Sequence, residues 1–211
     1  MSHPTLVNLL IAQLPLLELN VYGMMTRQEL ELVNENTMLA KTLTKLTFDI
    51  SSTIMDEAKT FGLLSSLCTN LPNLEDLSLT YETVPESKEL GIFGITTSAN
   101  IRDYCWSLPN LRNLRLNLHD YEPRWPRLHA PQLREIQGDI MQSDLWKIIG
   151  SCILLETVIV TLSKDLIEDH LVSSINTALS VPNAGSCLRE FSCQGNVSVT
   201  TYLFYQLLFY S

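Results

Sequence analysis

Basic residues are scarce in this chain, and their scarcity limits the partners that it can bind. The 211 residues include 14 Lys and Arg against 23 Asp and Glu, which gives a formal net charge of −9. Nucleic acids and anionic membranes are bound through clustered Lys and Arg side chains. The sequence holds no such cluster, so we expect neither a nucleic acid nor a membrane to be the partner.

The five cysteines lack the spacing of a metal site or of a disulfide framework. Their number is odd, and no two of them form a C-x-x-C pair. Such loosely spaced cysteines are typical of reduced, buried thiols. We therefore expect an intracellular protein, cytoplasmic or nuclear, that binds no metal.

Long apolar runs are absent as well. The C-terminal run at residues 202–210 has nine residues, whereas a membrane span needs about twenty. No basic residue precedes the apolar stretch at 6–14, as one would in a secretory signal, because the first basic residue is Arg27. We therefore expect neither segment to act as a membrane span or as a secretory signal.

The sequence also lacks the motifs of the common enzyme classes. Four His are scattered without metal-binding spacing, and no G-x-S-x-G elbow, phosphate-binding loop or G-x-G-x-x-G occurs. We therefore expect a protein that is not an enzyme and that uses no cofactor. The alternative left open is a Cys–His pair that forms only on folding, Cys105 with His119 or His129.

What the chain does contain is a repeated leucine pattern. Residues 71–79 (LPNLEDLSL) and 108–116 (LPNLRNLRL) are nearly identical and share the frame L-x-x-L-x-L. The frame, with some substitutions, fits seven places, which start at residues 16, 43, 74, 111, 133, 155 and 188. Repeats at such intervals indicate an array of stacked units. The spacing varies between 22 and 37 residues, so the units are irregular.

The segments between the matches are mostly helix-like. Residues 4–15 read as a helix, and Thr26 with Glu29 forms a capping box before a helix that carries Leu30, Val33 and Thr37 on one face. Apolar stripes at helical spacing predict further helices that start at Ser143 and Asp144 and that span residues 164–181. The stretch at 80–107 predicts an insertion or a broken helix. Three prolines in residues 119–131 predict an extended crossing there.

A strand followed by a helix in each unit predicts a stack with a parallel sheet on one side and helices on the other. This pattern resembles the leucine-rich repeat superfamily in its irregular, intracellular, ribonuclease-inhibitor-like form. The sequence LPNLRNLRLNL at 108–118 resembles the repeats of F-box/leucine-rich-repeat proteins. The resemblance implies an α/β solenoid, with a curved parallel sheet on the concave side and helices and irregular segments on the convex side. Residues 1–211 form a single array of about seven repeats in this interpretation.

The same resemblance implies a non-catalytic protein-binding module, the substrate-recognition region of an F-box ubiquitin ligase. The alternative is a scaffold or regulatory repeat protein without a ligase link. No F-box occurs in the sequence, and the repeat pattern runs to both ends of the chain. We therefore expect a piece of a longer array.

The two-residue period of a strand predicts which side chains face outward. The charged members of this outward set are six acidic residues (Glu18, Asp49, Asp76, Glu135, Asp139 and Glu190) and two basic ones (Lys45 and Arg115). This balance favours a basic protein segment as the partner. The binding candidates on this surface are Tyr22, Lys45, Asp49, Asp76, Asn113, Arg115, Glu135, Gln137 and Asp139.

A second candidate contact is the aromatic and proline-rich segment at 121–127. Interfaces favour Tyr, Trp and Arg, so Tyr121, Arg124 and Trp125 form a candidate hot spot. In the alternative interpretation, Trp125 fills the space in which a helix of this short repeat would have packed.

Overall fold

The computed structural model describes residues 4–51, 57–82, 104–119, 125–163 and 168–195. The strands in these ranges are β1 (Glu18–Met24), β2 (Lys45–Ser51), β3 (Asp76–Glu82), β4 (Cys105–Ser107), β5 (Asn113–His119), β6 (Arg127–His129), β7 (Glu135–Met141), β8 (Thr157–Ser163) and β9 (Glu190–Gly195). The helices are α1 (Pro4–Ile11), α2 (Arg27–Glu35), α3 (Thr37–Thr42), α4 (Glu57–Asn70), α5 (Gln142–Ser151) and α6 (Glu168–Leu179).

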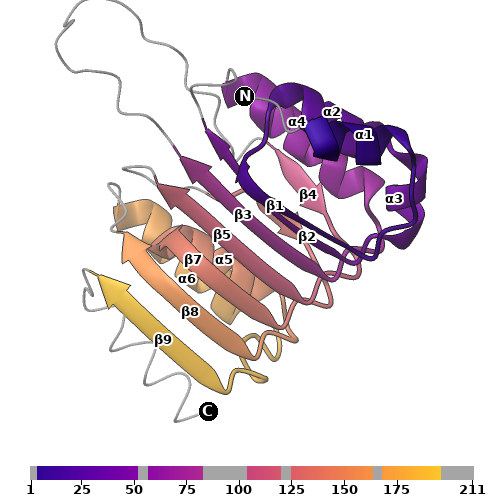
Figure 1. The fold of residues 1–211 in the computed structure, drawn as a ribbon. Coiled ribbons are helices and arrows are strands. Elements are labelled where there is room, and N and C mark those ends of the chain that lie inside the picture. The colour runs from indigo at the N-terminus through magenta and orange to yellow at the C-terminus, as the bar shows by residue number, and fades with distance from the viewer. Residues whose placement is uncertain (1–3, 52–56, 83–103, 120–124, 164–167, 196–211) are drawn as a thin grey trace, which may run out of the picture.

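Seven of these strands form one parallel sheet in the order β1-β2-β3-β5-β7-β8-β9 (Figure 1). The order follows the sequence, so each strand pairs with the strand of the preceding unit. Every strand of this sheet begins two residues after the start of one of the seven L-x-x-L-x-L matches. The predicted α/β fold with a parallel sheet is confirmed.

The leucine frame forms strands because its alternate side chains enter the core. In β3, Leu77, Leu79 and Tyr81 are buried, whereas the intervening Asp76 and Ser78 are partly exposed. The same alternation occurs in β2 and β8. Since one face of the sheet is apolar along its whole width, a second layer must cover it.

That second layer consists of the helices and of two short strands. Neighbours in it are α1 and α2, α2 and α4, α4 and β4, β4 and β6, β6 and α5, and α5 and α6. All the described helices lie on the same side of the sheet, and the other face carries none of them (Figure 1). We call this uncovered surface, formed by the outward side chains of the seven strands, the open face.

A repeated hydrogen-bond pattern holds the units in register where the strands begin. The carbonyl of Leu17 accepts from the amides of both Thr44 and Lys45, and the carbonyl of Thr44 accepts from both Glu75 and Asp76. The pattern continues from the carbonyls of Glu75, Arg112, Arg134 and Glu156 to the following units. In the two LPNL segments, the side chain of Asn73 donates to Lys41 O and that of Asn110 to Pro72 O, both at 2.9 Å.

The predicted helices are present, with corrections at their ends. The helix expected at residues 4–15 ends at Ile11, and the one expected to reach residue 181 ends at Leu179. The capping box of Thr26 and Glu29 opens α2, and Leu30 and Val33 are buried on its inner face. Thr37, however, is exposed and belongs to α3, because the Asn36 side chain caps a new helix there. The helix predicted at Ser143 begins one residue earlier, and its N-cap residue Met141 makes no side-chain cap bond.

The remaining expectations concern the irregular connections. Residues 127–129 are extended, as predicted, and pair with β4 in a two-stranded parallel sheet. Of the stretch at 80–107, where we expected an insertion or broken helix, residues 80–82 belong to β3 and 105–107 form β4. Residues 83–103 lie outside the described residues, as do residues 164–167 and 196–211.

Trp125 is not an exposed contact residue, so that part of the hot-spot prediction is wrong. Its side chain is 2% exposed, because β6 replaces a helix in the short connection from β5 to β7 and the indole fills the remaining space. The core alternative for Trp125 therefore holds. Tyr121 and Arg124 lie outside the described residues.

Candidate functional site

The open face carries polar side chains in rows that run across the strands. The strand register places a first row side by side, which consists of Glu18, Lys45, Asp76, Asn113, Glu135, Thr157 and Glu190. A second row contains Thr47, Ser78, Arg115, Gln137, Ile159 and Ser192. A third row contains Asp49, Thr80 and Asn117, and Asp139, Thr161 and Gln194 follow beyond β5, where β5 and β7 are no longer paired. Eight of the nine predicted binding residues lie in these rows, and Tyr22 is the exception.

Most of the charged side chains in the first row already bind a neighbour on the face. Lys45 forms a long ion pair with Glu18, at 3.8 Å between Nζ and Oε2. Asn113 donates to the Asp76 carboxylate, and Gln137 donates to Glu135 at 2.5 Å. Only the pair of Lys45 and Glu18 cancels charge, because the neutral amides of Asn113 and Gln137 bind the carboxylates of Asp76 and Glu135 without neutralising them.

The second and third rows hold charged side chains without such contacts. Within the described part of the chain, the side chains of Asp49, Arg115 and Asp139 have no hydrogen bond or ion pair. Glu190, on the edge strand β9, is likewise unpaired there, but it belongs to the first row. The third row thus contains two unpaired carboxylates, on β2 and on β7.

Two exposed apolar side chains accompany these polar groups. Ile159 lies in the middle of β8 and is 38% exposed. Tyr22 is 89% exposed and lies where β1 shifts out of register with β2, beside Gly23 with a φ of 103°. An exposed aromatic ring at a bulge offers a contact that a flat strand would not.

The sheet opens between β5 and β7. Pairing of these strands runs from Asn113 and Glu135 only to Leu116 and Gly138, whereas β7 pairs with β8 through Met141. Gly138 has a φ of 133°, and a Cβ there would collide with the carbonyl group of Leu116. Only glycine fits this position, and the two strands diverge directly after it.

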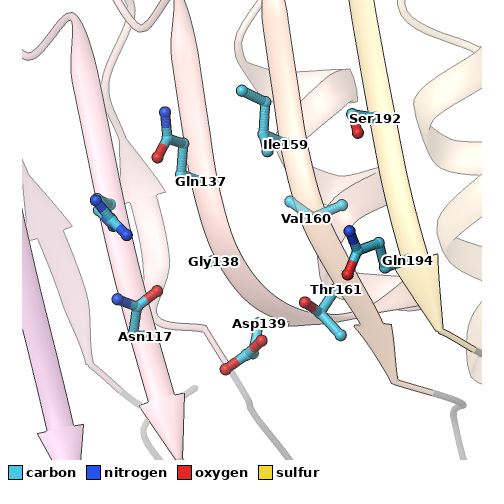
Figure 2. A pocket seen from close by; sticks show the side chains of 10 residues that line it. Asn117, Gln137, Gly138, Asp139, Ile159, Val160, Thr161, Ser192 and Gln194 are labelled. Atoms are coloured by element: carbon cyan, nitrogen blue, oxygen red, sulfur yellow. The ribbon is translucent and has the colours of Figure 1, made fainter.

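A hollow of about 200 Å³ lies on the open face next to this divergence. Figure 2 shows Gln137, Gly138 and Asp139 along β7, with Asn117 on one side and Thr161 and Gln194 on the other. Arg115 and Ile159 also line the hollow. Its walls therefore offer one cation, one carboxylate, several amides and hydroxyls, and one apolar surface.

Trp125 holds the backbone of this region from the covered side. Its indole Nε1 donates to the carbonyl oxygen of Asp139 at 2.7 Å. Asp139 directly follows Gly138, the last residue of β7 that pairs with β5. Its amide donates to the carboxylate of Asp144, which also binds Lys147 at 3.0 Å. The position of Asp139 on the open face is thus fixed by a buried side chain on the other side of the sheet.

The structure offers little for catalysis in its described parts. No group of three His, Cys, Asp or Glu there could hold a metal ion. Cys105 pairs in register with Arg127, two residues from His129, and no hydrogen bond joins that cysteine to that histidine. Burial raises the pKa of the Cys68 and Cys152 thiols, which disfavours the reactive thiolate.

The sequence prediction named the charged residues of the hollow but not the hollow itself. Gly138, Asn117, Ile159, Thr161 and Gln194 were not among the candidates. A signal was present, because Gly138 occupies a core position of the leucine frame in which the other strands carry an apolar side chain.

No family model, curated protein or solved structure matches this chain. None of the helices that the structure describes is long and apolar enough to cross a membrane.

Proposed function

We propose that this chain is an irregular leucine-rich repeat array that binds another protein through the open face of its sheet. The observation that carries the proposal is the open face itself, seven strands wide and uncovered by any described helix. Repeat arrays commonly present such extended sheets to their partners. The regular junctions between units and the leucine-frame match at each strand of the seven-stranded sheet support the assignment to this repeat class.

The charge of the face indicates the kind of partner. Six acidic side chains face outward against two basic ones, on a chain of net charge −9. A basic protein segment complements this surface, and opposite charge also speeds the encounter of the two molecules. The proposed partner is therefore a protein with an exposed basic segment.

Charge reversal on the open face tests the proposal. Tagged protein is used to capture partners from cells of the source, and the variants Asp76→Lys and Glu135→Lys are compared with the unchanged chain. We expect each reversal to weaken capture of the same protein. The matched control is Glu35→Lys, which makes the same change in charge at an exposed position on helix α2. Equal capture by all three variants would contradict the use of this face.

A ubiquitin-ligase subunit and a scaffold would both use the open face. The LPNL sequences of the repeats favour the first role, because they resemble the repeats of F-box/leucine-rich-repeat proteins. We therefore extend the proposal to substrate recognition for an F-box ligase. The half-life of the captured protein tests this extension, because a ligase substrate should persist longer when this chain is depleted. An unchanged half-life supports the scaffold role instead.

A further inference from the structure

The two unpaired carboxylates of the third row suggest how a partner lies on the open face. Asp49 on β2 and Asp139 on β7 share this row, and β3 and β5 lie between them. The other acidic residues of the face are paired with neighbours, except Glu190 on the edge strand. Unpaired carboxylates lose no existing contact when they bind a basic side chain.

Asp139 differs from Asp49 in lining the hollow next to Gly138. Figure 2 shows its carboxylate at one end of the hollow, with Asn117 across the gap between β5 and β7. The amide oxygens of Asn117 and Gln194 can accept hydrogen bonds from a guanidinium or ammonium group that reaches Asp139. A basic side chain can therefore enter the hollow at the end formed by Asp139, whereas Arg115, which also lines the hollow, would repel it.

The strand spacing relates the two carboxylates to a peptide. Paired strands lie about 4.8 Å apart, and β5 and β7 are no longer paired at Asp139, so the three steps from β2 to β7 span at least roughly 14 Å. An extended peptide advances about 3.3 Å per residue, so four residues cover roughly 13 Å. Residues i and i+4 of an extended chain also face the same side, whereas i and i+3 face opposite sides.

Arg115 determines what lies between the two basic residues. It is unpaired and stands in the second row on β5, between the strands of Asp49 and Asp139. Residue i+2 of the peptide, roughly 7 Å from residue i, would lie between β3 and β5, within reach of the long Arg115 side chain. A third basic residue there would be repelled, whereas an acidic or neutral one would be accepted.

From these placements we propose that the open face binds an extended peptide segment that crosses the strands. Basic residues at i and i+4 contact Asp49 and Asp139, and residue i+2 is acidic or neutral. The proposal rests on the proposed protein-binding function and names the chemistry of its ligand.

Selection from a displayed peptide library tests it. The library has one fixed arginine flanked by random residues, and the full chain is the bait. We expect enriched peptides to carry a second Lys or Arg four positions away and no basic residue midway. Enrichment of basic residues with no preferred spacing would overturn the proposal, and a library without any binder would overturn the proposed function with it.

Variants then assign the contacts with one selected peptide. Asp49→Asn and Asp139→Asn preserve the shape of unpaired side chains, so the fold should tolerate them. We expect each to weaken binding about two- to fivefold, and increasing salt should weaken binding to the unchanged chain. A peptide of the same composition with its basic residues at i and i+3 should bind more weakly.

Two outcomes separate this inference from the function on which it rests. The matched control is Glu35→Gln, which neutralises an exposed carboxylate on α2, away from the open face, and should leave affinity unchanged. If Asp76→Lys abolishes peptide binding while Asp49→Asn and Asp139→Asn do not affect it, the open face binds proteins but the proposed register is wrong. If none of these variants matters, both proposals fail.

Discussion

At the scale of single residues, Gly138 determines where the sheet divides. A hydrogen atom instead of a side chain lets β7 approach the carbonyl of Leu116, and its φ of 133° then turns the following residues away from β5. The Trp125 indole donates a hydrogen bond to the carbonyl of Asp139, which directly follows this turn. One missing side chain thus creates both the opening and the hollow.

We expect Gly138→Ala to destabilise the protein strongly. The positive φ strains any L side chain, and the added Cβ would meet a backbone group that cannot rotate aside. The free energy of unfolding should fall by at least about 2 kcal/mol. Chemical denaturation monitored by circular dichroism measures this change.

Gly62→Ala is the matched control for that substitution. Gly62 lies within α4, and the nearest atom to the added methyl group would be Tyr104 Cε1 at 4.0 Å. Since alanine favours a helix over glycine, this change should raise stability by about 0.5–1 kcal/mol. A similar effect of the two substitutions would show that Gly138 is not constrained as described.

At the scale of elements, Asn36 joins three helices at one point. Its Oδ1 accepts from the amides of Met38 and Leu39 at the start of α3, and its Nδ2 donates to the carbonyl of Leu10 in α1 at 2.8 Å. The residue directly follows α2 and is 4% exposed. Water cannot replace these bonds without opening the helix layer.

Replacement of Asn36 by alanine should therefore cost about 2–3 kcal/mol, from the lost cap and the unpaired buried groups. Asn36→Asp keeps the cap but loses the donor to Leu10, so its cost should be intermediate. The comparison is Asn73→Ala, whose exposed side chain donates to Lys41 and can be replaced by water. Denaturant titrations of the three variants check this order, and equal losses would refute it.

The elements also show what a sequence can and cannot predict. The strands of the sheet were predictable because each apolar residue of the leucine frame is buried on one face, which is a local, periodic requirement. The end of α2 was not predictable, because the Asn36 side chain donates a hydrogen bond to the carbonyl of Leu10, 26 residues earlier. The opening at Gly138 also depends on a distant residue, Leu116 in the previous strand.

At the scale of the whole molecule, buried thiols couple stability to pH. Burial raises the pKa of the Cys68 thiol well above its usual 9.0, and burial raises that of Cys152 against a smaller opposing effect of the Ser151 hydroxyl. In the unfolded chain both thiols ionise near their usual pKa, while in the folded chain they stay protonated. The unfolded state therefore loses protons first as the pH rises.

We expect the free energy of unfolding to be unaffected by these thiols below about pH 8 and to fall above about pH 9, by up to ~1.4 kcal/mol per pH unit for each thiol. Urea unfolding at a series of pH values measures the slope. Cys68→Ala should be less stable at neutral pH but should lose stability less steeply in alkali. An unchanged slope in this variant would contradict the assignment.

The short register between β5 and β7 has a mechanical consequence. Because β1 and β9 are opposite edges of the sheet, tension applied to these two strands acts across the ladder and loads its junctions in series. The β5–β7 junction has four paired residues, whereas its neighbours β3–β5 and β7–β8 have seven each. The edge junction β1–β2 also has four paired residues, with a shift of register between them. Under load the stack should therefore separate first at β1–β2 or, in its interior, at β5–β7, and a ligand that spans β2 to β7 would hold the β5–β7 junction together.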